Sequence, residues 1–415
     1  MSGTAPGGSG SVTGLVLAGG GARGAYEAGA LSVLLPALAA RGERPTVLVG
    51  SSVGAINAAF LAAVAHLPAR EAAAGLVEQW RRTGLRDVMN PLPAQAWWLL
   101  NRGIAGLLPT AGIGPTGLLN PEPTRDHLRR CIDWAQLRRN IDAGQAVLAV
   151  IATDVGRERA VVFCDGKVAL PSFASHLLDY VPVQIGEDHV RASAAIPVLF
   201  PAVRVEEPPE ARGWYVDGST RLNTPIKPAL DLQVDRVVVV STAAIPSAQE
   251  RPPRSDRAPN LGDGALNMLH SRLVDPLVED MRALGVVNSF FAGSDPGGVT
   301  YRRARGKPSY RQVPYIFVAP QHHSLLGGLA QQVFHEHYRG FRSLRNPELA
   351  VFGRVFGARA VHGELFSYLF FAPEYIDELL ALGAADAQAW LQAPPGPDDP
   401  WQVGPLDALA IPDTA

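Results

Sequence analysis

The chain has 415 residues, of which 47% are hydrophobic and 18% are charged, and its formal net charge is −2. This composition is typical of a globular protein, and the absence of a basic charge excess argues against a nucleic-acid partner. The two cysteines, Cys131 and Cys164, are too few for a disulfide framework and favour a reducing compartment.

Residues 1–12 are rich in Gly and Ser, which predicts a disordered tail, and they lack the basic and apolar regions of a secretory signal. Gly and Pro interrupt every long apolar stretch, so the sequence predicts no transmembrane helix. We therefore expect a cytoplasmic protein, and a peripheral association with membranes stays open.

A first strand–loop–helix unit is predicted at the start of the ordered chain. Residues 13–18 indicate a short buried strand, the glycine-rich loop GGGARG occupies residues 19–24, and residues 25–38 have a helical pattern. The loop also matches G-x-G-x-x-G, but a dinucleotide site needs the next strand to end in an acidic residue, and that strand ends in Ser52. The remaining use of such a loop is to present backbone N–H groups to an oxyanion.

The second unit places a serine in a tight turn. A strand at residues 46–49 runs into GSSVG at residues 50–54, which fits G-x-S-x-G with Ser52 in the middle, and a helix follows. The glycines avoid steric collisions at the sharp turn, so Ser52 is a candidate nucleophile beside a helix amino end. The alternative is a small-residue turn between buried elements.

The alternation of strands and helices predicts an α/β fold with a mainly parallel central sheet flanked by helices. Sites in such sheets lie at the carboxyl ends of the strands, where both turns fall. Further strands are predicted at residues 146–154, 160–163, 214–216, 236–241 and 315–320, and a last helix at 373–391. Asp217 follows one of these strands and precedes a glycine, so it is either a turn residue or a carboxylate at the same sheet edge as Ser52.

Two stretches after the second helix stand out by composition. Residues 88–121 form an apolar insertion that contains two tryptophans and a single charged residue, Arg102. This insertion is either buried in the fold or a lipid-facing lid that contacts the membrane peripherally. Residues 124–140 predict one basic amphipathic helix, whose charges form a solvated face or attract anionic lipid headgroups.

The core elements are interleaved along the chain, which predicts a single domain. We place this domain at residues 13–391, with insertions near residues 88–121 and 246–260. Residues 392–415 form a Pro/Asp-rich tail.

Taken together, the motifs resemble those of the patatin-like phospholipase family, and the resemblance covers roughly residues 13–245. The matching segments are the glycine-rich loop and first helix at 19–31, the nucleophile turn at 50–55, the SAAIP segment with Phe200 and Pro201 at 192–201, and the aspartate motif at 217–218. The family pattern has Gly or Ala after Asp217-Gly218, whereas this chain has Ser219. We hypothesise that the Ser219 hydroxyl hydrogen-bonds Asp217 and shifts its basicity.

The resemblance implies a three-layer α/β/α fold and a serine lipid acyl hydrolase of the phospholipase A or lysophospholipase type. Ser52 would attack the ester and Asp217 would take its proton, without a histidine between them. The oxyanion hole would come from the loop residues Gly19, Gly20, Gly21, Ala22 and Arg23. Arg23 would also steer a headgroup or form a structural salt bridge. The implied substrate is a phospholipid or another fatty-acyl ester, and no cofactor is implied.

Two other functions compete with this hypothesis. A Ser-His-Asp carboxylesterase or thioesterase acting on short soluble esters needs a histidine downstream, and none of the candidates has a recognisable signature: His270, His322, His323, His335, His337 and His362. A non-catalytic lipid-binding protein would not need both Ser52 and Asp217. Without clustered carboxylates or cysteines beside the histidine pairs, we expect no metal site, and the sequence leaves the oligomeric state undefined.

Overall fold

The computed structural model describes residues 11–88, 120, 122–171, 178–197, 199–222, 225–244, 288, 312–322, 325–338, 366–393 and 399–404. The predicted insertion at 246–260 and nearly all of the insertion at 88–121 lie outside these residues. So do most of the predicted tails at 1–12 and 392–415.

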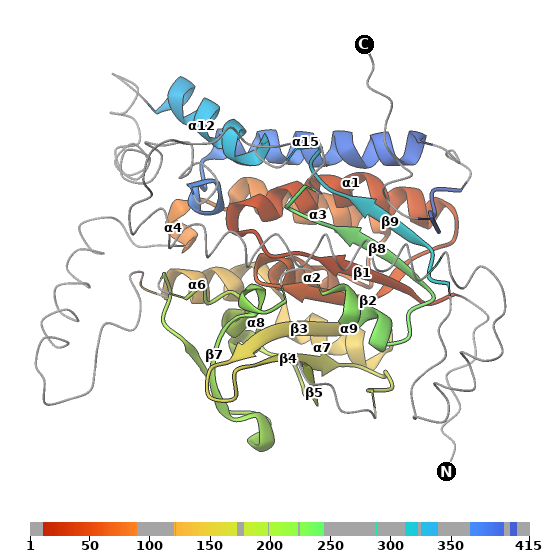
Figure 1. Ribbon diagram of the computed structural model, residues 1–415, viewed down its shortest axis with the longest axis vertical. Helices are drawn as coiled ribbons and strands as arrows, with labels where there is room; N and C mark the ends of the chain where they lie inside the picture. The colour runs from red at the N-terminus through yellow and green to blue at the C-terminus, as the bar shows by residue number, and fades with distance from the viewer. Residues whose placement is uncertain are drawn as a thin grey trace, which may run out of the picture.

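A nine-stranded sheet forms the centre of the fold (Figure 1). Its main path runs β5-β4-β3-β2-β1-β8-β9, and β7 pairs with both β3 and β6. Neighbours from β3 through β2, β1 and β8 to β9 are parallel, as are β4 and β5, while β3–β4, β3–β7 and β6–β7 are antiparallel. The strands are β1 Thr13–Leu17, β2 Pro45–Ser51, β3 Val147–Asp154, β4 Arg159–Asp165, β5 Leu178–Pro182, β6 Val203–Val205, β7 Gly213–Asp217, β8 Arg236–Val240 and β9 Tyr315–Val318.

The central strands are apolar on both faces because helices cover both sides of the sheet. In β1, Leu15 and Leu17 pack into one hydrophobic core and Val16 packs into the other. Successive side chains of a strand point to opposite faces of the sheet, which explains this alternation. A nearly continuous apolar sequence is typical of a buried parallel strand.

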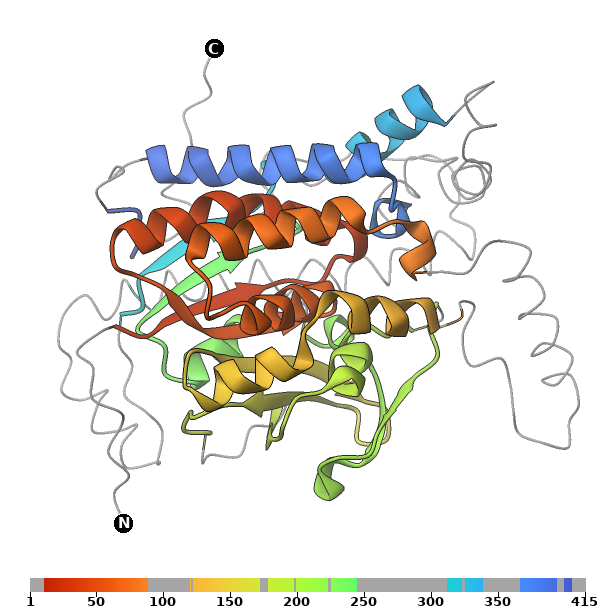
Figure 2. The ribbon, with the colours of Figure 1, turned by 180° about the vertical axis from the view of Figure 1, so that it is seen from behind.

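Most of the described helices lie on one face of the sheet, which Figure 2 shows toward the viewer, and α9 packs against the other face (Figure 1). The three-layer α/β/α fold is thereby confirmed. The longer helices are α1 Gly24–Ala40, α2 Val53–Ala63, α3 Ala69–Arg82, α6 Glu122–Cys131, α7 Trp134–Asp142, α12 Leu325–His337 and α15 Pro373–Gln392, and the shorter ones are α4 Leu85–Val88, α8 Glu187–Ser193 and α9 Ile226–Asp231.

 The last helix, α15, packs directly on α1, although the two helices lie near opposite ends of the chain. The two helices approach closely because each carries a glycine at the contact. A Cβ at Gly29 would lie 2.1 Å from the Leu380 carbonyl oxygen, and a Cβ at Gly383 would lie 2.0 Å from the Tyr26 carbonyl oxygen. The C-terminal helix is therefore an integral part of the layer that α1 begins.

The basic segment at 124–140 differs from its prediction, because it forms two helices, α6 and α7, rather than one. Asp133 separates them as the N-cap of α7, where its Oδ1 accepts the Gln136 N–H at 2.8 Å. Such a cap satisfies an amide that would otherwise lack a partner, so a new helix starts there.

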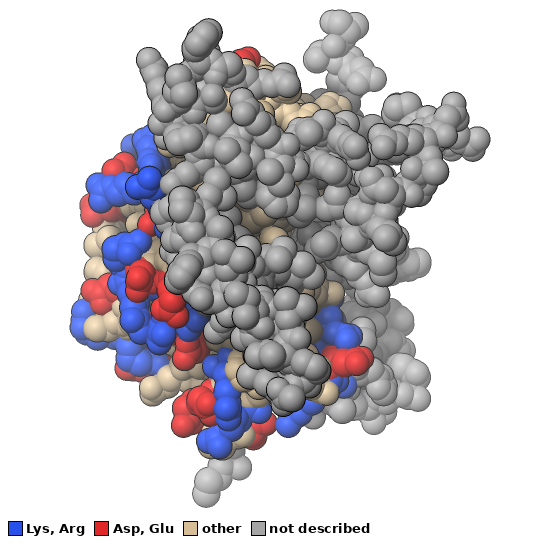
Figure 3. Space-filling model, turned by 90° about the vertical axis from the view of Figure 1, so that its left-hand side faces the viewer, with Lys and Arg blue, Asp and Glu red and all other residues tan. Residues whose placement is uncertain are grey.

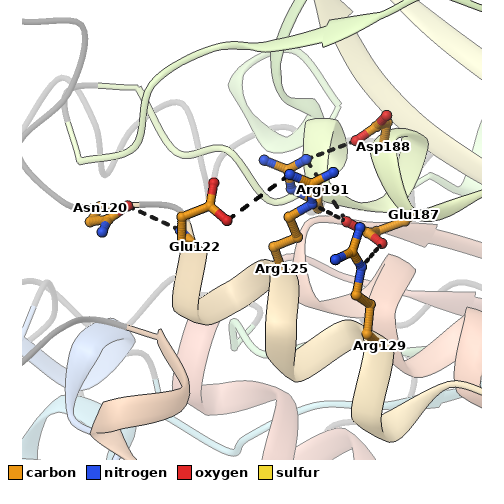
Figure 4. Close-up of polar contacts among 7 residues, drawn as sticks. All are labelled: Asn120, Glu122, Arg125, Arg129, Glu187, Asp188 and Arg191. Carbon is orange, nitrogen blue, oxygen red and sulfur yellow. Dashed lines mark hydrogen bonds and ion pairs between the residues drawn. The ribbon is translucent and has the colours of Figure 1, made fainter.

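The arginines of α6 are paired with carboxylates. Arg125 and Arg129 donate to Glu187 of α8 at 2.8 and 2.6 Å (Figure 4). Arg130 donates to Asp87 at 2.6 Å. In the described part of the face drawn in Figure 3, basic and acidic side chains are interspersed. This pairing favours the interpretation of the charge run as a solvated face. None of the described helices is long and apolar enough to cross a membrane.

Candidate active site

Ser52 lies in the turn between the end of β2 and the start of α2. Its φ of 54° is in the left-handed region, which is strained for a residue with a side chain. Gly54 makes the turn sterically feasible, since a Cβ there would lie 2.4 Å from the Leu17 carbonyl oxygen. The predicted strand–turn–helix unit is present, and it places the Ser52 hydroxyl at the carboxyl end of β2.

Asp217 is the last residue of β7, and the structure brings it to Ser52. The Ser52 Oγ donates a hydrogen bond to Asp217 Oδ2 at 2.6 Å, and the Ser219 N–H donates to Asp217 Oδ1 at 2.8 Å. The sheet creates this contact, because β2 and β7 pair with consecutive parts of β3. Ser51 lies opposite Ile151 and Asp217 lies opposite the next residue, Ala152, so the ends of the two strands meet. No histidine stands between the two side chains.

Burial controls the basicity of Asp217, which is 2% exposed. Loss of hydration raises the pKa of Asp217 to about 6, and the hydrogen bonds from Ser52 and Ser219 oppose this rise by stabilising the carboxylate. The Ser219 hydroxyl contributes to that lowering, and it also lies 3.4 Å from the Ser51 hydroxyl. A carboxylate with this pKa is suited to accept a proton near neutral pH.

The glycine-rich loop lies beside the same turn. Gly21 has a φ of 56°, and it borders the same cavity as Ser52. Thr242 fixes the start of the loop by donating to the Gly19 carbonyl oxygen at 2.6 Å. The Arg23 N–H donates to the Gly20 carbonyl oxygen at 3.1 Å, so that amide already has a partner within the loop.

The side chain of Arg23 is buried and contacts residues near the C-terminus. It is 2% exposed, its Nε donates to Ser367 Oγ at 2.8 Å, and its guanidinium lies 4.3 Å from the centre of the Tyr368 ring. These contacts join the loop to residues 366–371 near the C-terminus. Arg23 therefore connects the glycine-rich loop to the segment that precedes α15.

An apolar cavity opens at Ser52 and contains about 790 Å³ of empty space, part of it open to solvent. Its apolar walls come from α2, α3, the segment after α8 and the segment before α15, with the side chains Val53, Ile56, Phe60, Leu76, Trp80, Ile196, Phe200, Leu369 and Phe371. A hydrocarbon chain fits such a surface better than a polar group does.

Several residues that contact Ser52 and Asp217 were not predicted from the sequence. Ser193 accepts the Ser52 N–H at 2.9 Å, and the Thr153 and Thr220 hydroxyls donate to the Asp217 carbonyl oxygen at 3.1 and 2.8 Å. The SAAIP segment was the available signal for Ser193. Nothing in the local pattern of residues 366–371 indicates that they line the cavity.

Among the described histidines, His127 borders the cavity, and its Nδ1 lies 3.5 Å from Asp87 Oδ1. His270, His323 and His362 lie outside the described residues. Within the described part of the chain, no group of three or more His, Cys, Asp or Glu side chains is arranged to hold a metal ion.

The family of the chain follows from a comparison with protein-family models. The model of the patatin-like phospholipases matches residues 15–230, which is just over half of the chain and includes both Ser52 and Asp217. The chain belongs to the patatin-like phospholipase family. The family consists of lipid ester hydrolases, so the resemblance seen in the motifs is confirmed.

Two solved structures resemble the chain at low identity. VipD from Legionella pneumophila is 15% identical with a TM-score of 0.31, and the match covers 89% of this chain and 67% of VipD. The human GIVD cytosolic phospholipase A2 is 14% identical with a TM-score of 0.42, and the match covers 92% of this chain and 59% of the human protein. At these values neither structure assigns an activity to this chain. No curated protein matches the sequence significantly.

Proposed function

We propose that this chain is a serine lipid acyl hydrolase of the phospholipase A or lysophospholipase type that uses a Ser52–Asp217 dyad. The observation that carries the proposal is the direct hydrogen bond of 2.6 Å from Ser52 Oγ to the buried Asp217 carboxylate, at the opening of an apolar cavity. A nucleophile and its base need this contact for proton transfer.

In the proposed reaction, Asp217 accepts the Ser52 proton as Ser52 Oγ attacks the ester carbonyl carbon. The tetrahedral intermediate expels the alcohol, which takes up a proton from Asp217, and an acyl-enzyme remains. Water, deprotonated by Asp217, then attacks the acyl-enzyme, and the fatty acid leaves as Ser52 regains its proton.

The glycine-rich loop is the proposed oxyanion hole. Of the predicted residues Gly19, Gly20, Gly21, Ala22 and Arg23, we assign the main donors to Gly20 and Gly21. Gly21 borders the cavity at Ser52, whereas the Arg23 N–H is engaged with the Gly20 carbonyl oxygen. Donors held in place before the reaction stabilise the negative charge without reorganising.

The cavity supports a fatty-acyl ester as substrate. Its lining exposes far more apolar than polar surface, and Ile56 and Phe60 continue it along α2 for about 12 Å beyond Ser52, at ~1.5 Å per residue. The acyl chain would lie in this cavity, with the headgroup toward solvent.

A peripheral membrane contact through residues 88–121 is part of the proposal. Residues 89–119 and 121 lie outside the described part of the chain, but Val88 on one side and Thr124 on the other both border the cavity. The Thr124 hydroxyl donates to the Val88 carbonyl oxygen at 3.4 Å. The apolar insertion is therefore attached where a lipid would enter.

The decisive experiment is labelling with a fluorophosphonate probe, followed by hydrolysis assays on a panel of phospholipids, lysophospholipids and short soluble esters. We expect the probe to label the wild type at Ser52 and not to label Ser52→Ala, and we expect long-chain lipids to be hydrolysed faster than short esters. Labelling at another serine, or equal labelling of Ser52→Ala, would contradict the assignment of the nucleophile.

The pH dependence of kcat/KM tests whether Asp217 is the proton acceptor. Because the carboxylate must be ionised to accept a proton, we expect kcat/KM on a soluble ester to fall about tenfold per pH unit below about pH 6, the pKa of buried Asp217. In Ser219→Gly the hydroxyl that lowers this pKa is removed, so the acid limb should move to higher pH. Superimposable profiles of the wild type and Ser219→Gly would remove Ser219 from the mechanism.

A further inference from the structure

The end of α8 and the residues just after it accept hydrogen bonds from the backbone N–H groups of both members of the proposed dyad. Ser193 Oγ accepts the Ser52 N–H at 2.9 Å, and the Ala195 carbonyl oxygen accepts the Asp217 N–H at 2.9 Å. Two residues of one segment therefore hold Ser52 and Asp217, which lie 165 positions apart in the sequence.

The hydroxyl of Ser193 is fixed in direction. Ser193 is fully buried, and its O–H donates to the Ile151 carbonyl oxygen at 2.5 Å. Since the proton is used in that bond, an oxygen lone pair remains available for the Ser52 N–H. The hydroxyl thereby connects β3 to the turn after β2.

Ser52 needs such a partner more than an ordinary residue does. Its left-handed backbone conformation is strained, and strained conformations persist only where surrounding contacts hold them. Its N–H is also buried, and a buried donor without a partner is costly. The Ser193 hydroxyl meets both requirements at one position.

The helix that carries Ser193 is itself anchored to the rest of the fold. At its first turn, Glu187 accepts hydrogen bonds from Arg125 and Arg129 of α6, and Arg191 donates to Asp188 at 2.7 Å (Figure 4). Charge-assisted bonds of this kind restrict the movement of α8. The helix that ends at Ser193 is thereby joined to α6.

We propose that Ser193 is a positioning residue, which holds the Ser52 backbone so that the Ser52 hydroxyl stays within proton-transfer distance of Asp217. This proposal rests on the proposed Ser52–Asp217 function. Ser193 acts only through Ser52, and it neither contacts the substrate nor transfers a proton.

The test compares Ser193→Ala with Ser193→Thr, which keeps the hydroxyl, and with Ser32→Ala. Ser32 is a matched control, because its hydroxyl also bonds a backbone carbonyl, that of Gly29 at 2.6 Å, and it lies on α1 away from the dyad. For Ser193→Ala we expect kcat on a soluble ester and the rate of fluorophosphonate labelling to fall about 10- to 100-fold, with KM changed by less than about threefold. Ser193→Thr should recover most of the loss, and Ser32→Ala should match the wild type.

The pH profile separates positioning from a general loss of stability. The hydrogen bond from Ser52 lowers the pKa of Asp217, so a displaced Ser52 should shift the acid limb of kcat/KM to higher pH in Ser193→Ala. A merely less stable protein would keep the wild-type profile. If folded Ser193→Ala is labelled at the wild-type rate with an unchanged profile, the positioning role is wrong. If the probe does not label the wild type at Ser52, the proposed function itself fails.

Discussion

Asp217→Asn should lower kcat/KM by at least about 10⁴-fold while making the folded protein more stable. An asparagine cannot accept the Ser52 proton, and losses of this size are typical when a member of a catalytic unit is removed. Activity on a soluble ester and on phospholipid vesicles measures the first effect. A variant within tenfold of the wild type would show that Asp217 is not the base.

The gain in stability follows from the sign of the pKa shift. Burial raises the pKa of Asp217 from 3.8 to about 6, so the folded protein binds this proton more tightly than the unfolded chain does. Asp217 therefore destabilises the fold increasingly as the pH rises from about 4 to about 6, by about 1–3 kcal/mol at pH 7.5. Urea unfolding should show Asp217→Asn to be more stable by this amount at pH 7.5, with the difference shrinking toward pH 4. A difference that does not depend on pH would contradict the assigned cause.

Gly21→Ala should reduce kcat by about 10²- to 10³-fold, the usual effect of losing one oxyanion donor. Gly21 has a φ of 56°, and a Cβ there would lie 2.2 Å from the Tyr368 carbonyl oxygen. The loop must move away from residues 366–371, and its N–H groups move with it. Steady-state kinetics on a soluble ester, with thermal unfolding to establish that the protein is folded, measures the effect.

Gly42→Ala is the matched control for this substitution. Gly42 has a similar φ of 71°, but nothing lies within 4 Å of the position that a Cβ would take. We expect a loss of stability of about 1 kcal/mol and a wild-type kcat. Gly42→Ala shares with Gly21→Ala the strain of a left-handed backbone, but not the steric collision at the added Cβ. If Gly21→Ala also keeps the wild-type kcat, the glycine-rich loop does not hold the oxyanion.

The patterns that are local in sequence were sufficient to predict the centre of the fold. Apolar strands such as residues 13–17 and 236–240, and the sharp turn at Ser52, depend on neighbouring residues, so their pattern predicts the parallel sheet and the position of the serine. The predicted helix at 373–391 agrees with α15 for the same reason. The basic segment at 124–140 was predicted wrongly, because the helical period of its residues continues through Asp133, where a side-chain cap starts a second helix.

The sequence by itself determined the family, the strand–turn–helix unit at Ser52 and Asp217 as the candidate base, since these depend on motifs of a few adjacent residues. Only the tertiary structure decided that β3 places Asp217 at 2.6 Å from Ser52, that Ser193 holds the Ser52 N–H, and that residues 366–371 line the cavity and support the glycine-rich loop. Each of these contacts joins residues more than 140 positions apart. Such pairs meet only when the sheet and the packing of its helices bring their segments together.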